Sequence, residues 1–281
     1  MTTVLKTEAS PPRPGTDLAG RLQRFSWNFT DTFVVARRNL IRYVRLPQLL
    51  VFSTIQPIMF VLLFAYVFGG AITVPGNIDY INYLIPGIMI QTVLFGASQT
   101  TVGLAEDLSQ GMIDRFRSLP MARSAVLAGR TLADSIRNVF VVLLMVGVGY
   151  LIGFSFQNGL PAAIAAILIV VAFGHAFSWI SAFLGLITKD PEAAQVAGFV
   201  WIFPLVFASS AFVPVETMPD WLQAFAEVQP ISRTINAARY LTLGDAAPGA
   251  SMTDVWLTLV WMAGIMAVFV PLSIWQYRRS T

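Results

Sequence analysis

Six long apolar stretches constrain the fold of this chain more than any other feature of its sequence. A helix needs about 20 predominantly apolar residues to cross a hydrocarbon core of roughly 30 Å. The stretches that meet this requirement are residues 48–68, 84–105, 139–156, 160–187, 193–213 and 255–277. With 56% hydrophobic and 12% charged residues among 281, the chain has too little polar surface to cover a soluble domain of this size. The sequence therefore predicts an all-α integral membrane protein with six transmembrane helices.

The basic residues indicate how these helices are oriented. The segment between the first two spans carries only Asp79 as a charge, whereas the segments before the first span and after the second are rich in arginine. Lys and Arg collect in cytoplasmic loops of membrane proteins. This pattern predicts two cytoplasmic termini, with sixteen of the eighteen basic residues inside and only Arg233 and Arg239 outside. Residues 1–25 are polar and Pro-rich and are expected to form a disordered cytoplasmic tail, and residues 26–281 the membrane domain.

Residues 26–45 combine apolar residues at near-helical spacing with a dense set of arginines. The pattern favours a helix that lies in the cytoplasmic interface, with its apolar stripe in the acyl boundary and its arginines among the lipid headgroups. The alternative is a solvated basic tail. The residues that define this interfacial helix are Trp27, Arg37, Arg38, Arg42 and Arg45.

Residues 106–119 continue the second span into the cytoplasm as an amphipathic segment. Such a helix, held beyond the membrane surface, is suited to a groove on another protein. A connector that folds against its own bundle fits the pattern equally well. Gly111 costs a helix about 1 kcal/mol relative to Ala and marks a bend. The residues expected to dock are Glu106, Asp107, Leu108, Met112, Asp114, Arg115, Phe116 and Arg117.

Residues 212–254 form a long outer segment with more helical signal than a loop requires. A first short helix is expected from Asp220 to Pro230, and a second from residue 231 to 243, where Gly244 ends it. This outer hairpin can dip into the membrane like a re-entrant loop or cap a pathway. Its marker residues are Pro214, Trp221, Pro230, Arg233 and Arg239.

The sequence contains few residues that could support enzymatic chemistry. It has no cysteine and one histidine, which excludes Cys-ligated and multi-His metal sites, and its two lysines lie outside any P-loop pattern. Its basic residues cluster beside apolar segments, so they favour lipid headgroups over nucleic acid. No carboxylate lies centrally in an expected span. His175, halfway along the fourth span, takes either a structural role, bonded to Ser178, Ser181 or a facing helix, or a role in a transport pathway.

Three blocks of the chain resemble a known family. They are ARRNLIRYVRLPQLLVFSTIQPIMFVLLFAYVFGG at 36–70, GLAEDLSQGMIDRFRSLPMARSAVLAGRTLAD at 103–134 and FVPVETMPDWLQAFAEVQPISRTINAARYLTLG at 212–244. In these blocks the chain is similar to the permease subunits of ABC-2 type transporters, and within them to the daunorubicin-resistance-type drug exporters. The resemblance covers nearly everything after residue 25.

The resemblance implies a bacterial cell-membrane permease that pairs with a second permease, as a homodimer or heterodimer, and binds two copies of a separate ATPase. ATP and Mg²⁺ would be held by that ATPase. The segment before the first span would be the connecting helix, residues 106–119 the coupling helix, and residues 214–243 the outer hairpin. The expected cargo is a hydrophobic or amphipathic, drug-like compound. Alternatives are a lipid, glycan or polyketide-like product, or a self-sufficient secondary transporter.

Overall fold

Helices make up all the regular structure that the chain shows in its described ranges. The computed structural model describes residues 18–45, 47–76, 78–112 and 123–279. The long helices are α1 (Leu18–Arg45), α3 (Tyr80–Ser109), α5 (Arg123–Leu151), α6 (Gly159–Thr188) and α10 (Met252–Arg279). The shorter ones are α2 (Pro47–Leu63), which the π-helical turn η1 (Phe64–Phe68) extends, α7 (Pro191–Phe207), α8 (Asp220–Val228) and α9 (Pro230–Leu243). Two 3₁₀ turns, η2 (Val215–Thr217) and η3 (Gly244–Ala246), flank α8 and α9.

Four helices are long and apolar enough to cross a membrane, counting the described residues alone. They are α3, α5, α6 and α10, while α2 with η1, and α7, are apolar but shorter. Helix α3 is central, since α5, α6, α7 and α9 all pack against it and nearly all its side chains are buried. Helix α10, in contrast, exposes a broad apolar face that includes Trp256 and Val260. A helix that is apolar all round, at the surface as well as in the core, is typical of a multi-pass membrane protein.

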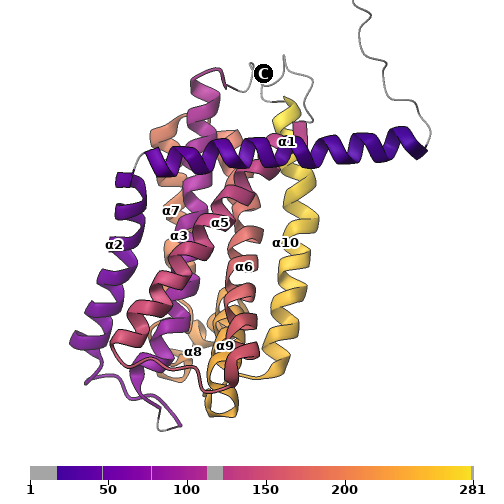
Figure 1. Cartoon of the computed structure of the whole chain (residues 1–281). Helices are drawn as coiled ribbons and strands as arrows, with labels where there is room; N and C mark the ends of the chain where they lie inside the picture. Colours follow the sequence, from indigo (N-terminus) through magenta and orange to yellow (C-terminus); the bar gives the residue numbers. More distant parts are fainter. Residues whose placement is uncertain (1–17, 46, 77, 113–122, 280–281) are drawn as a thin grey trace, which may run out of the picture.

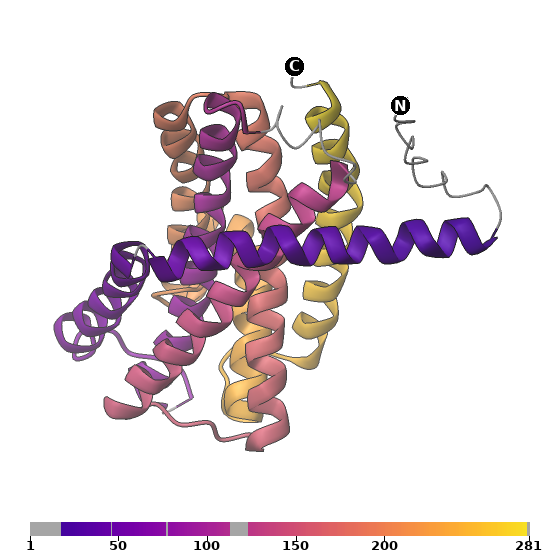
Figure 2. The same cartoon turned by 45° about the horizontal axis from the view of Figure 1, so that its top comes forward.

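Helix α1 lies transverse to the other long helices, near the end of the bundle where α10 terminates (Figures 1 and 2). It packs on α5, with Val35 and Ala36 buried. Gly129 of α5 allows this close approach, because a β-carbon there would lie 2.6 Å from the Thr32 carbonyl oxygen. Helices α8 and α9 lie at the opposite end of the bundle (Figure 1).

Two helices begin earlier than the sequence indicates. Helix α1 starts at Leu18, so residues 18–25, expected in a disordered tail, form its first two turns. Helix α5 starts at Arg123, well before residue 139. The assignment of Arg130 and Arg137 to a cytoplasmic loop is therefore wrong, since both are buried within α5. A span predicted from hydropathy stops where charged residues begin. A packed helix can nevertheless contain a charged residue whose charge is paired inside the protein.

Glycine also sets the spacing between α3 and its neighbours. A β-carbon on Gly185 of α6 would lie 2.5 Å from the carbonyl oxygen of Thr101 in α3. A β-carbon on Gly87 of α3 would collide with the backbone at Ala211. In both places one backbone lies directly on another, which is the usual way for helices to approach closely in a membrane.

We expect Gly185→Ala to lower the free energy of unfolding by about 1–3 kcal/mol, because the added methyl group must push α6 away from the α3 backbone. Gly264→Ala in α10 is the matched control, since no atom lies within 4 Å of a β-carbon there. Unfolding of both variants in mixed micelles, followed by circular dichroism against denaturing detergent, tests this. Equal stability of the two variants would contradict the packing argument.

Candidate functional site

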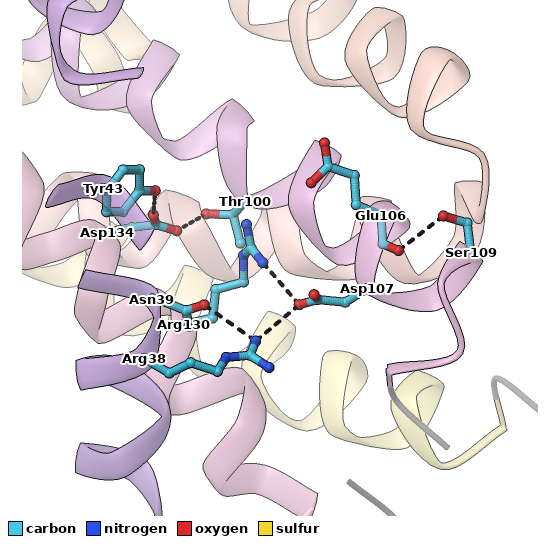
Figure 3. A network of polar contacts seen from close by, with 9 residues as sticks. All are labelled: Arg38, Asn39, Tyr43, Thr100, Glu106, Asp107, Ser109, Arg130 and Asp134. Atoms are coloured by element: carbon cyan, nitrogen blue, oxygen red, sulfur yellow. Dashed lines mark hydrogen bonds and ion pairs between the residues drawn. The ribbon is translucent and has the colours of Figure 1, made fainter. Parts of the chain in front are cut away.

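Buried charges join α1, α3 and α5 near the end of the bundle that α1 crosses (Figure 3). The carboxylate of Asp107, in the last turns of α3, is almost fully buried. Its Oδ2 lies 3.1 Å from Nη1 of Arg130 in α5 and 3.7 Å from Nη2 of Arg38 in α1. The guanidinium of Arg130 occupies the space beside Gly103 that any side chain would fill. We call Arg38, Asp107 and Arg130 the Asp107 cluster.

A second buried carboxylate, that of Asp134, lies on α5 one helical turn beyond Arg130. Asp134 is 1% exposed and accepts hydrogen bonds from the Tyr43 hydroxyl, at 2.8 Å, and from the Thr100 hydroxyl. Arg137 donates to the Gly96 carbonyl oxygen at 2.8 Å and to the Tyr43 oxygen at 3.4 Å. Burial, reinforced by the charge of Asp134, raises the pKa of Tyr43 to about 12. The Tyr43 hydroxyl therefore keeps its proton and remains a donor to Asp134 at any physiological pH. We call Tyr43, Thr100, Asp134 and Arg137 the Asp134 cluster.

Together the two clusters tie α1 to both membrane helices beneath it. Arg38 and Tyr43 are the residues that α1 contributes, and each reaches a carboxylate on a different helix. Displacing Tyr43 would take away one of the two hydroxyl donors of the buried Asp134 carboxylate, which costs about 1–3 kcal/mol. Helix α1 therefore cannot shift without α3 and α5 following it or losing these bonds.

The structure brings together only part of the interfacial and docking sets expected from the sequence. Arg38 and Asp107 meet in the Asp107 cluster, whereas Arg37 and Arg45 are exposed on α1. Trp27 and Arg42 lie on α1, but their side chains are outside the described residues.

Residues 106–109, expected to start the docking helix, are instead the last turn of α3. The helix ends at Ser109, and Gly111 follows with a φ of +65°, a left-handed conformation that suits glycine after a helix. Leu108 packs against the apolar residues at this end of the bundle. The Ser109 hydroxyl donates a hydrogen bond to the Glu106 carbonyl oxygen. Met112 is half-buried. The remaining members lie outside the described residues: Asp114, Arg115, Phe116 and Arg117.

Sequence reasoning missed Tyr43, Arg130, Asp134 and Arg137. Three of them carried a readable signal, because positions 130, 134 and 137 are spaced four and three residues apart and so share one face of a helix. Three ionisable residues on one face, with opposite charges among them, indicate a paired stripe within a helix. Tyr43 carried no such signal, because nothing in its neighbourhood distinguishes it from the other apolar positions of α1.

At the opposite end of the bundle, the two arginines that the sequence places in an outer hairpin also have partners. Arg239 of α9 is 1% exposed, and its guanidinium donates to the carbonyl oxygens of Tyr83, at 3.0 Å, and Ser210, at 2.5 Å. The guanidinium carbon lies 3.4 Å from the centre of the Tyr83 ring, a cation–π contact. Arg233 pairs with Asp254 at the start of α10, with 2.9 Å between the charged atoms.

The remaining hairpin markers define its geometry. Pro214 precedes η2, and Pro230 is the first residue of α9, where a missing N–H costs nothing. Trp221 on α8 is 74% exposed. The hairpin therefore presents an aromatic surface outward while Arg239 fastens its inner helix to α3 and to the end of α7.

His175 is bonded to a helix other than its own. Its Nδ1 lies 2.8 Å from the hydroxyl of Ser135 in α5, and its Nε2 accepts from the indole N–H of Trp179 at 3.3 Å. An accepting Nε2 requires Nδ1 to carry the proton, which it donates to Ser135. Ser178 bonds to the Gly174 carbonyl instead of the histidine. Both ring nitrogens thus have partners within the bundle.

Removal of one partner from the Asp107 cluster should be far more harmful than removal of two. Asp107→Leu leaves Arg130 buried without its carboxylate and should lower the free energy of unfolding by about 3–5 kcal/mol. Asp107→Leu combined with Arg130→Met should recover most of that loss, because Arg38 can turn its half-exposed side chain to solvent. Asp79→Leu, in the exposed first loop, controls for the substitution itself. A double variant as unstable as the single one would show that the ion pair is not the cause.

Comparison with known proteins assigns the chain to a family. Residues 30–243, which include both clusters and the outer hairpin, match the family described as ABC-2 type transporter. The chain is 36% identical over 243 residues to a daunorubicin resistance ABC transporter permease protein of Streptomyces coeruleorubidus, a match that covers 86% of this chain and 84% of that protein. It is 29% identical over 282 residues to a probable doxorubicin resistance ABC transporter permease protein of Mycobacterium tuberculosis, over 100% and 99% of the two chains. These matches confirm the resemblance seen in the three sequence blocks, and the chain belongs to the ABC-2 type transporter family.

Proposed function

We propose that this chain is the permease subunit of an ATP-driven exporter that moves a hydrophobic or amphipathic, drug-like compound out of the cytoplasm or inner leaflet. Family membership supports the transporter class, and the names of the two relatives support a drug as cargo. The observation that carries the mechanism is the Asp107 cluster, which links the end of α3 to α1 and α5 through buried charges. Because of these contacts, a displacement of the end of α3 would also move α1 and α5.

Six spans are the topology that we propose for this permease. Helices α3, α5, α6 and α10 supply four of them, α2 with η1 the first and α7 the fifth. Helix α7 has 17 residues and is about 25 Å long at 1.5 Å per residue, slightly less than the hydrocarbon thickness, which a locally thinned bilayer accommodates. Both termini would be cytoplasmic, which fits the position of α1 and of Arg278 and Arg279 at one end of the bundle.

The end crossed by α1 would then be cytoplasmic and α1 itself an interfacial helix, with α8 and α9 as the outer hairpin. The exposed Trp221 and Phe225 of α8 suit the interface of the outer leaflet, where aromatic rings are enriched. The membrane would be the bacterial cell membrane. This arrangement is also the one that the distribution of Lys and Arg favours.

The energy source would be a separate ABC ATPase, in two copies, that docks on residues 106–119. The chain itself has no P-loop, so ATP and Mg²⁺ would bind in the partner. A second permease, identical or different, would complete the translocation pathway. ATP-driven closure of the ATPases would push the end of α3, and Asp107 would pass the displacement to Arg130 and Arg38.

Doxorubicin accumulation in cells that carry the chain with its ATPase tests this function. We expect lower accumulation than in cells with a hydrolysis-deficient ATPase. Phe116→Ala and Arg117→Ala should restore accumulation without loss of membrane insertion, whereas Lys189→Gln, a basic residue in a different loop, should leave export intact.

Export that persists without ATP hydrolysis would favour a secondary transporter. Normal export by the Phe116 and Arg117 variants would contradict docking at residues 106–119, and export only of a lipid or glycan would contradict the cargo.

The proposed topology has its own test, helped by the absence of cysteine from the chain. A single cysteine in place of Asp79 should react with a membrane-impermeant maleimide in intact cells, because the first loop would face outward. A single cysteine in place of Lys189 should react only after the membrane is permeabilised. The reverse pattern would invert the orientation, and labelling of both positions in intact cells would exclude an odd number of crossings between them.

A further inference from the structure

A side cavity of about 60 Å³ lies midway along the bundle, between α2, α3, α5 and α7. Its lining combines aromatic rings with amide groups and one arginine, and the amides and the arginine distinguish it from the apolar core around it. The rings are those of Phe60, Phe95 and Phe199, and the amides are those of Gln56, Gln91, Gln99 and Asn138. Arg137 supplies the charge.

Two of these amides each have one atom that lacks a hydrogen-bond partner. Nδ2 of Asn138 lies toward Gly174 of α6, 3.2 Å from where a β-carbon would stand, and the other unpaired atom belongs to Gln91. Gln91 is 3% exposed, and its Oε1 has no partner among the described residues. A buried acceptor without a donor costs about 1–3 kcal/mol, so such atoms are rare and call for an explanation. A ligand that brings an O–H or N–H group into the cavity would remove that cost.

Arg137 restricts which donor can enter. Its guanidinium is held by the Gly96 carbonyl, the Asn138 amide oxygen and the Tyr43 hydroxyl, and it forms no ion pair within the described part of the chain. Arg137 is the one charged residue among the described residues that line the cavity, while Asp134 lies behind the Tyr43 hydroxyl. A guanidinium at the cavity wall disfavours a cationic amine beside it and favours a neutral hydroxyl. The same charge attracts a second oxygen on the ligand, since guanidinium N–H groups are strong donors.

The aromatic rings define the rest of the ligand. Phe95 and Phe199 lie with their centres 5.4 Å apart, and Phe60 leads toward Phe64 and Phe212, whose rings stack at 4.3 Å. Such surfaces accept a flat ring by stacking. Drug-sized ligands fill pockets of about 300–1,000 Å³, so this cavity holds only one end of such a molecule. Gln56 and Gln99 are exposed, so the cavity opens at the surface of the bundle, where the rest of a ligand can extend.

We propose that this cavity binds the neutral, hydroxyl-bearing aromatic end of the exported compound. Gln91 would accept a hydrogen bond from the hydroxyl, and Arg137 would donate one to a second oxygen attached to the aromatic system. The identification of the ligand as cargo rests on the proposed export function. The binding chemistry itself rests on the cavity. Arg137 also belongs to the Asp134 cluster, so the subsite shares a residue with the contacts that hold α1.

The experiment compares two small fluorescent probes, in one of which a methyl group replaces the hydroxyl hydrogen of the other. The O–H of 2-naphthol can donate to Gln91, whereas the methyl ether of 2-methoxynaphthalene cannot. Binding is measured on the chain with its ATPase in lipid nanodiscs, and the ratio of the two dissociation constants is compared between wild type and Gln91→Leu. The comparison of ratios cancels the partition of each probe into lipid. We expect the ratio to favour 2-naphthol roughly tenfold more in wild type than in Gln91→Leu, the value of one buried hydrogen bond. Gln195→Leu, the same change at an exposed residue of α7 outside the cavity, should keep the preference.

A second measurement leaves Gln91 untouched. A single cysteine in place of Gln99 reports on occupancy, because a bound probe slows its reaction with maleimide. We expect 2-naphthol to slow labelling several-fold and 2-methoxynaphthalene to have little effect at the same concentration. An unchanged preference in Gln91→Leu would overturn the subsite and leave the cavity to water alone.

The subsite and the export function can fail independently, and these measurements distinguish the two cases. Loss of the 2-naphthol preference in Gln91→Leu, with protection of the Gln99 cysteine, supports the subsite even if doxorubicin is not exported, and then only the cargo is wrong. Doxorubicin export with neither preference nor protection supports the proposed function and overturns the subsite.

Discussion

Pairing of buried charge is the constraint on which the rest of this structure depends. In a bundle of apolar helices a single ion is expensive, and the carboxylate of Asp107 is tolerated because Arg130 and Arg38 reach it from two other helices. These contacts fix α1 across α3 and α5. The position of α1 in turn places Tyr43 against Asp134 and Arg137, deeper in the bundle. Helix α1, which lies across the bundle, is thus attached to α3 and α5 through polar contacts.

The opposite end follows the same rule with different groups. Arg239 is enclosed without a carboxylate partner among the described residues, and backbone carbonyl oxygens together with the Tyr83 ring stabilise its charge. The carbonyls at Ser210 and Ala211 are free to accept because α7 has already ended at Phe207. Between the two ends, Oε1 of Gln91 is one of several buried polar atoms without a hydrogen-bond partner, and it belongs to a residue that lines a cavity. Paired charges hold the helices together at the two ends, and an unsatisfied acceptor in a cavity can take a donor from a ligand.

Much of the fold could be predicted from local pattern. The apolar stretches locate the helices that pass through the bundle, and Pro230 and Gly244 bound α9, as their backbone preferences indicate. The start of α5 could not be found in this way, because hydropathy treats Arg130, Asp134 and Arg137 as a polar loop. Only their pairing partners make them compatible with a buried helix. The same limit applies to the candidate site: Arg38 and Asp107 were identified as charged members of separate segments, but not as partners of each other.

The sequence by itself determined that this chain is a helical membrane protein of the ABC-2 type transporter family, because hydrophobic length and local motifs are properties of contiguous residues. The tertiary structure alone decided which charges meet, that His175 bonds Ser135 across helices, and that Gln91 lines a cavity without a partner. These facts join residues separated by 21 positions, as Arg233 and Asp254 are, up to 91 positions, as Tyr43 and Asp134 are, and no local pattern encodes such separations. They follow from how the helices pack, which the glycines at the α3–α6 contact and the paired charges at α1 together set.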